Sequence, residues 1–120
     1  MGRYCLEICC GTASEAAEAA ANGADRIELN SALEVGGLTP SAGCAEAARS
    51  LTGAPLLAMI RPRPGDFCYD GVEWRTALAD ARAMLRRGAD GLVFGFLRPD
   101  RTIDADRVRA TIIGVSSKLP

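Results

Sequence analysis

The chain has 120 residues, the length of one small domain or of part of a larger one. Its 14 Lys and Arg residues nearly balance its 15 Asp and Glu residues. This net charge of -1 argues against binding to nucleic acid or to an anionic membrane surface, which need a basic excess. Because the chain contains no histidine, its chemistry has to come from carboxylate, arginine, cysteine, tyrosine or backbone groups.

The first half of the chain predicts two strand–helix units. Residues 5–10 form an apolar segment expected to be a strand, and an alanine-rich helix with Ser14 as its N-cap is expected to run to residue 22. A second short strand is expected over 26–29, followed by a glycine-containing loop and a helix over 41–51.

The second half predicts two more units of the same kind. Residues 56–60 are almost purely apolar, which is typical of a buried parallel strand. A polar loop over 61–69 leads to the most strongly amphipathic segment of the chain, a helix expected over 72–87. The last pair is a strand over 91–94 and a helix over 105–113.

An internal repeat supports this order of elements. Residues 22–29 resemble residues 87–94, 65 positions further on, and in both segments a glycine ends the helix and Ala-Asp leads into the strand. Four such units predict a parallel sheet with right-handed crossovers. A unit of roughly 30 residues fits a (β/α)8 barrel, which needs about 250.

The fold prediction is therefore an α/β protein comprising the N-terminal half, about four βα units, of an incomplete TIM (β/α)8 barrel. A small open α/β sheet is the alternative. Residues 114–120 resemble a loop that leads to a further strand. We expect one partial barrel domain over 1–120, truncated before its fifth strand.

Five charged residues are predicted to gather at the barrel mouth. Strand alternation points Glu7, Glu28 and Arg61 inward, and Arg63 and Asp66 lie on the loop above them. Such a pocket would bind a small anionic substrate, with Arg61 as a bidentate clamp and Glu7 or Glu28 as a general base. The alternative is a Glu–Arg network that sets the barrel register and performs no chemistry. Both interpretations predict that Glu7, Glu28 and Arg61 form one connected ionic network.

The five cysteines predict the redox setting and give little support for a metal site. Their number is odd, and neither a secretory leader nor a membrane-spanning apolar run is apparent, so we expect reduced thiols in a cytoplasmic protein. Cys9 and Cys10 are adjacent in a strand and should point to opposite sides. Cys5 and Cys9 share a side but lie roughly 13 Å apart at ~3.3 Å per residue. Any ion held by such thiols would be a soft one, such as Cu(I).

The loop over 36–41 has two interpretations. Its Gly-Gly-Leu-Thr-Pro-Ser sequence precedes a helix, whose free backbone N–H groups could hold an anion. The alternative is a tight turn followed by an N-cap at Ser41.

Several longer motifs, in this order along the chain, resemble the CutC copper homeostasis family. They are Leu-Glu-Ile-Cys-Cys (6–10), Asn-Gly-Ala-Asp-Arg-Ile-Glu-Leu (22–29), Glu-Val-Gly-Gly-Leu-Thr-Pro-Ser (34–41), Met-Ile-Arg-Pro-Arg (59–63), Gly-Asp-Phe-Cys-Tyr (65–69) and Gly-Ala-Asp-Gly-Leu-Val-Phe-Gly (88–95). The resemblance implies a TIM barrel, a cytoplasmic setting, a role in copper homeostasis and Cu(I) binding by cysteines near the ends of the first strands.

The resemblance places the copper ligand on Cys9. A second family cysteine corresponds to Asn30, and Pro64 stands where the family usually has glycine. We therefore expect weak copper binding or none. The family continues with a strand bearing a His-Arg-Ala-Phe-Asp motif, which would follow Pro120.

Three functional hypotheses result. The protein handles copper, or it is a barrel enzyme acting on a small anionic substrate, or it is an inactive truncated form. The expected partners are a copper ion or small anionic ligand and a second copy of the chain, which could restore an eight-stranded ring.

Overall fold

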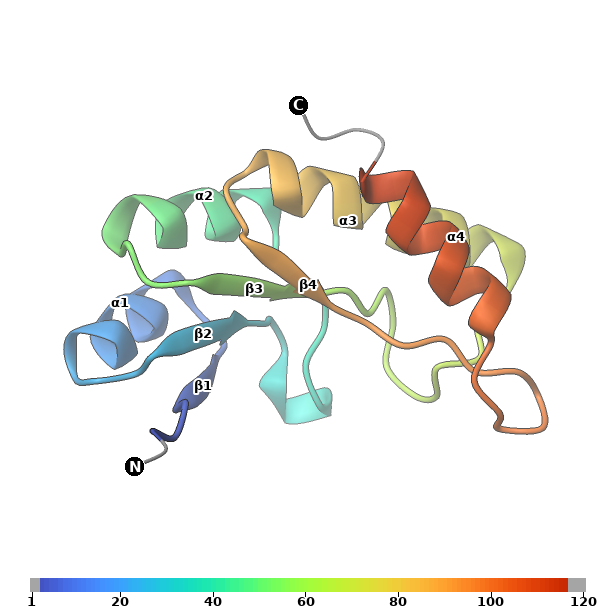
Figure 1. Ribbon diagram of the computed structural model, residues 1–120, viewed down its shortest axis with the longest axis horizontal. Coiled ribbons are helices and arrows are strands. Elements are labelled where there is room, and N and C mark those ends of the chain that lie inside the picture. The colour runs from blue at the N-terminus through green and yellow to red at the C-terminus, as the bar shows by residue number, and fades with distance from the viewer. Residues whose placement is uncertain (1–2, 117–120) are drawn as a thin grey trace.

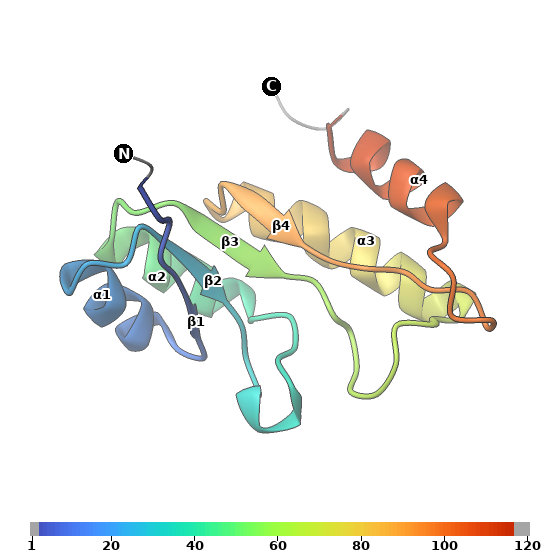
Figure 2. The ribbon, with the colours of Figure 1, turned by 60° about the horizontal axis from the view of Figure 1, so that its bottom comes forward.

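The computed structural model describes residues 3–116, which form a parallel four-stranded sheet with helices packed along one side (Figure 1). The strands are β1 (Glu7–Cys10), β2 (Arg26–Leu29), β3 (Leu56–Met59) and β4 (Gly91–Val93). The helices are α1 (Ala13–Ala21), α2 (Ala42–Leu51), α3 (Gly71–Arg86) and α4 (Ala105–Ser116), with a 3-10 turn, η1 (Leu33–Val35), before α2. Figure 2 shows η1 and the loop before α3 extending from the same end of the sheet.

The order of the strands confirms the fold prediction. They lie in the order β1-β2-β3-β4, and every neighbouring pair is parallel. One α-helix connects each strand to the next. This is the order in which successive βα units build a barrel wall. Within the described residues, β1 and β4 each pair with a single strand, so the wall has two open edges.

Strand alternation separates the two faces of the sheet as the sequence predicts. The face toward the helices is buried and forms the core. The opposite face corresponds to a barrel interior, and its residues are in part accessible. The first group includes Cys10, Ile27, Leu29, Leu56, Ala58 and Ile60, and the second includes Glu7, Cys9, Glu28, Leu57 and Met59.

The N-terminus of α1 differs from the prediction. The cap is Thr12, whose backbone is extended and whose hydroxyl accepts a hydrogen bond from the Glu15 N–H at 3.0 Å. Ser14 lies inside the first turn, where its own backbone is helical, so it cannot act as the cap. The start of α2 is as predicted, because Ser41 accepts from the Cys44 N–H at 3.0 Å.

The sequence repeat corresponds to a structural repeat. The backbone N–H of Asp25 donates to the Leu6 carbonyl at 2.8 Å, and its carboxylate accepts from the Leu6 N–H at 2.8 Å. Asp90 makes the same pair of bonds with Leu56, at 2.8 and 2.9 Å. The glycine two residues before each aspartate ends a helix in the left-handed region, with φ of 106° and 107°. Each aspartate therefore joins the start of one strand to the start of its neighbour.

Candidate functional site

A hydrogen-bonded group of three side chains lies near the carboxyl ends of β1 and β2, on the face away from the helices. The Cys9 thiol donates to Glu28 Oε2 at 3.2 Å, and Asn30 Nδ2 donates to the same oxygen at 2.8 Å. Strand register places Cys9 directly opposite Glu28, and the Asn30 side chain is only 1% exposed. We call Cys9, Glu28 and Asn30 the thiol–carboxylate cluster.

The chemistry of Cys9 follows from this neighbourhood. Partial burial, the hydrogen bond to Glu28 and the negative charge of Glu28 together raise the pKa of the Cys9 thiol to about 11. At neutral pH the thiol therefore keeps its proton and is a poor nucleophile, because the thiolate is the reactive form. Within the cluster, Glu28 acts as a hydrogen-bond acceptor that holds Cys9 in its thiol form.

Arg61 holds two loops together instead of joining the carboxylates. Its side chain is 7% exposed, Nη1 donates to the carbonyls of Val35 (3.0 Å) and Gly37 (2.9 Å), and Nη2 donates to the Gly65 carbonyl (2.7 Å). Its guanidinium carbon also lies 5.3 Å from the Phe67 ring centre. Among residues 3–116 no carboxylate pairs with Arg61, so the predicted ionic network is wrong. The physical reason is that the loop carbonyls already use both terminal nitrogens.

Glu7 does not lie at the mouth. It is the first residue of β1, at the amino end of the strand, and its carboxylate pairs with the neighbouring Arg26. This ion pair raises the pKa of the Arg26 guanidinium. Glu7 is three residues from Cys10, the last residue of β1, and is therefore about 10 Å from the mouth along the strand. Strand alternation placed Glu7 on the correct face of the sheet. It does not show at which end of the strand a residue lies.

Arg63 and Asp66 organise the loop between β3 and α3. Arg63 pairs with Asp66 at 3.1 Å and with Glu73 at 3.2 Å, and it also donates to the Cys68 carbonyl. Asp66 accepts from the Cys68 N–H at 3.1 Å, and this bond, together with Arg63, lowers the pKa of the Asp66 carboxyl. The Arg63 guanidinium further lies 4.9 Å from the Tyr69 ring centre. Both residues therefore have their polar partners within this loop and at the start of α3.

The loop over 36–41 connects the thiol–carboxylate cluster to Arg61. Gly37 has φ of 94°, and a Cβ there would lie 2.4 Å from Asn30 Oδ1, so only glycine fits. Its carbonyl is one of those that Arg61 binds. The loop is thus a tight turn against Asn30, and Ser41 caps the helix that follows, which favours the second interpretation of this segment. Asn30, which enters the sequence analysis only as the position of a second family cysteine, is the residue that links Glu28 to this loop.

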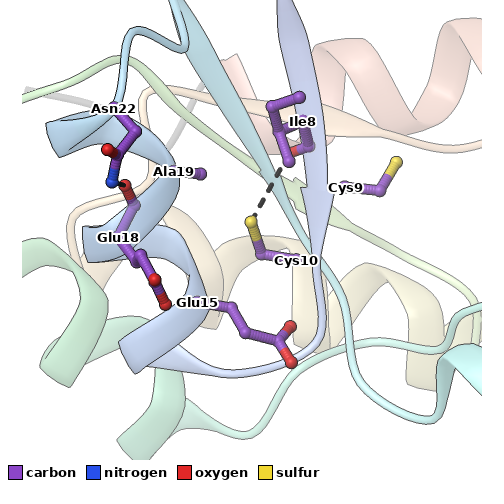
Figure 3. A pocket seen from close by; sticks show the side chains of 7 residues that line it. All are labelled: Ile8, Cys9, Cys10, Glu15, Glu18, Ala19 and Asn22. Atoms are coloured by element: carbon purple, nitrogen blue, oxygen red, sulfur yellow. Dashed lines mark hydrogen bonds between the residues drawn. The ribbon is translucent and has the colours of Figure 1, made fainter.

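The two adjacent cysteines lie on opposite sides of β1, as predicted. A cavity of about 440 Å³ lies between β1 and α1. Figure 3 shows Cys10 pointing toward the helix and Cys9 pointing away from it. The Cys10 thiol donates to the Ile8 carbonyl at 3.7 Å. A single ion cannot be held by both sulfur atoms in this arrangement.

The described residues offer Cu(I) few ligands. All five cysteines are free thiols, and no group of three or more His, Cys, Asp or Glu side chains in residues 3–116 is arranged to hold a metal ion. Cu(I) prefers soft sulfur ligands, and the thiol–carboxylate cluster supplies one thiol, one carboxylate and one amide. The cluster does not form a complete copper site.

Parallel βα units in sequential order, with polar side chains near the carboxyl ends of the strands, define this molecule as part of a (β/α)-barrel protein. The model of the CutC family matches residues 4–120. The chain belongs to this family.

Relatives and a solved structure agree with this assignment. A CutC family protein from Treponema denticola is 50% identical over 107 residues, which cover 89% of this chain and 44% of the relative. The copper homeostasis protein cutC homolog of Drosophila melanogaster is 43% identical over 116 residues, covering 96% and 44%. The crystal structure of the putative copper homeostasis protein CutC from Streptococcus agalactiae superimposes with a TM-score of 0.87 at 30% identity, covering 98% of this chain and 57% of that one. The chain thus spans less than half the length of these two sequence relatives.

No helix within residues 3–116 is both long and apolar enough to cross a bilayer.

Proposed function

We propose that the protein acts in copper homeostasis as the N-terminal half of a (β/α)8 barrel, with 1–120 as a partial barrel domain. Family membership over residues 4–120 and the name of the Drosophila relative support this role. The structural observation behind a direct contact with Cu(I) is Cys9, an exposed thiol on the inner face near the carboxyl end of β1. The odd number of cysteines, all free in the described residues, supports a cytoplasmic setting.

The contact with Cu(I) is expected to be weak and to depend on pH. The metal binds the thiolate, so Cys9 must lose a proton that the adjacent Glu28 carboxylate stabilises. Because the pKa of Cys9 is about 11, affinity should increase as the pH rises toward that value. A lone thiol with no second sulfur ligand adds to this weakness.

A Cu(I) competition titration with a coloured chelator, under reducing conditions, tests the proposal. The C9S variant should lose the copper that the unmodified chain takes from the chelator. The matched control is C5S, because Cys5 is also exposed but precedes β1 at its other end. Stoichiometric, tight binding of Cu(I) that survives in C9S would contradict the proposal.

Binding of a small anionic substrate is the second candidate function. Glu28 favours it, because both hydrogen bonds of the cluster go to Oε2. Among residues 3–116, Oε1 has no hydrogen-bond donor, so it can accept a proton or a hydrogen bond from a ligand. Arg61, Arg63 and Asp66 would shape the surrounding loops through their backbone contacts. Glu7, at the opposite end of its strand, would take no part.

We also propose that two copies associate edge to edge, with β4 of one copy beside β1 of the other. Unpaired edges and exposed apolar side chains such as Leu6 and Ile113 support this arrangement, and eight strands would close the ring. Sedimentation velocity at micromolar concentration should show a dimer. A stable monomer that unfolds cooperatively and binds no dye for exposed apolar surface would contradict it.

A further inference from the structure

A second cavity lies at the same end of the sheet as the thiol–carboxylate cluster. Its volume is about 560 Å³, within the range of small-molecule sites. It lies between the β3–α3 loop and the β4–α4 loop, and the carboxyl ends of barrel strands are where ligands of (β/α) barrels bind. The lining residues are Asp66, Cys68, Leu97, Arg98, Pro99 and Arg101.

Arg101 has an unfavourable backbone conformation in this lining. Leu97 and Ile103 form an isolated antiparallel bridge, and the Arg101 N–H donates to the Arg98 carbonyl at 2.8 Å, so residues 97–103 form a hairpin. Arg101 has φ of 71°, in the left-handed region that a hairpin of this kind usually gives to glycine. An arginine here costs conformational strain, and strained residues gather at functional sites.

Arg98 and Arg101 have hydrogen-bond donors that no other protein group in residues 3–116 uses. Among residues 3–116 the Arg101 side chain has no hydrogen-bond or ion-pair partner. Arg98 donates from Nη1 to the Ile103 carbonyl at 3.0 Å, and its Nη2 is 3.9 Å from the nearest carboxylate oxygen, on Asp106. Asp66, the one acidic residue of the lining, is already paired with Arg63.

The acidic residue between the two arginines is also engaged. The Asp100 carboxylate accepts from the Thr102 N–H at 3.0 Å and from the Thr102 hydroxyl at 2.6 Å. It therefore stabilises the turn from within. The two guanidinium groups remain as the available cations at the cavity.

We propose that this cavity binds the phosphate group of a small molecule through Arg98 and Arg101. Guanidinium groups match the geometry of phosphate oxygens, and two of them match its double charge. The proposal deepens the second candidate function, because it places the anion at Arg98 and Arg101 and not at the engaged Arg61 and Arg63. It does not depend on copper binding by Cys9.

Calorimetric titration of the chain with pyrophosphate and with inorganic phosphate, at fixed ionic strength, tests the proposal. R101A should weaken pyrophosphate binding by about tenfold, the loss expected for a charge-assisted hydrogen bond. R101K keeps the charge but loses the planar guanidinium fork, so it should bind more weakly than the unmodified chain and more tightly than R101A. R86A is the matched control, because Arg86 is an exposed arginine of α3 that does not line the cavity.

The R101G variant separates the side chain from the backbone. Glycine adopts the left-handed conformation without strain, so the thermal midpoint should rise while pyrophosphate binding weakens as it does in R101A. The proposal is overturned if the unmodified chain binds neither anion. Equal losses in R101A and R86A would also overturn it, because they would indicate a general charge effect. A lower thermal midpoint in R101G would contradict the backbone strain at Arg101 on which the proposal rests. The copper titration of C9S is a separate measurement, so failure of either proposal can be recognised independently.

Discussion

The unit β1–α1–β2 and the unit β3–α3–β4 repeat one hydrogen-bonding motif, but its aspartate has a different arginine in each. Asp25 pairs with Arg3, whose side chain is 84% exposed. Asp90 pairs with Arg49, which is 25% exposed and also donates to the carbonyls of Gly88, Thr52 and Ala54. The same sequence motif is therefore anchored loosely in the first unit and firmly in the second.

The inner faces of the two units differ as well. In the first unit this face carries the ion pair of Glu7 with Arg26 and the contact of Cys9 with Glu28. In the second unit it is apolar and borders a cavity of about 350 Å³. That cavity is lined by Met59, Phe67, Val93, Phe94, Gly95 and Leu97. Repetition of the backbone motif has fixed the architecture, while the inward side chains have been free to diverge in polarity.

The largest effect is expected from removing the firmer anchor. R49A should reduce the free energy of unfolding by about 3 kcal/mol, because it leaves three partly buried carbonyls and the Asp90 carboxylate without their charged donor. R3A should leave the stability unchanged, since exposed ion pairs contribute little. Urea denaturation followed by circular dichroism measures both. Equal losses in the two variants would show that the anchors are equivalent.

The glycines before the two aspartates sharpen the same comparison. Both have positive φ, but a Cβ on Gly88 would lie 2.5 Å from Arg49 Cγ, whereas a Cβ on Gly23 meets nothing within 4 Å. G23A should cost about 1 kcal/mol of backbone strain, and G88A about 2 kcal/mol because the Arg49 side chain must also move. Thermal unfolding of both variants provides the measurement. A G88A variant as stable as G23A would mean that Arg49 adapts without loss.

The polar inner face of the first unit can be tested through the thiol. E28Q removes the neighbouring negative charge, so the pKa of Cys9 should fall from about 11 by about one unit. The rate of alkylation by iodoacetamide as a function of pH reports the change, with a C5S background to remove the other exposed thiol. An unaltered pH profile in E28Q would show that the charge of Glu28 does not raise the pKa of Cys9.

The sequence predicted the elements and faces of this molecule better than the partners of its side chains. Periodicity and the repeat were sufficient for the parallel sheet, and parity placed Cys9 and Glu28 on one face, where they are in contact. The partners of Arg61 could not be predicted, because they are backbone carbonyls of two loops whose path depends on the whole fold. Asn30 followed the same parity, but only the observed approach of Gly37 shows how it links the loop to Glu28.

The smallest effects concern the corresponding helices α1 and α3, which begin differently. At α3, Asp70 accepts from the Glu73 N–H at 2.8 Å and Glu73 accepts from the Asp70 N–H at 3.1 Å, so the cap is reciprocal. At α1 the Thr12 hydroxyl makes the corresponding bond to the third helical residue. T12A should cost about 1 kcal/mol, and D70A slightly more because the returning Glu73 side chain loses its fixed position.

Ser14 supplies the control for this last comparison. It lies within the first turn of α1 and its side chain is exposed, so S14A should leave the free energy of unfolding unchanged or raise it slightly, since alanine is the better helix former. Chemical denaturation of T12A, S14A and D70A under identical conditions ranks the three. A loss in S14A equal to that in T12A would restore Ser14 as the cap and would shift the start of α1 by two residues. The difference between the two variants therefore tests the boundary of the helix that lies directly behind Cys10 in the first unit.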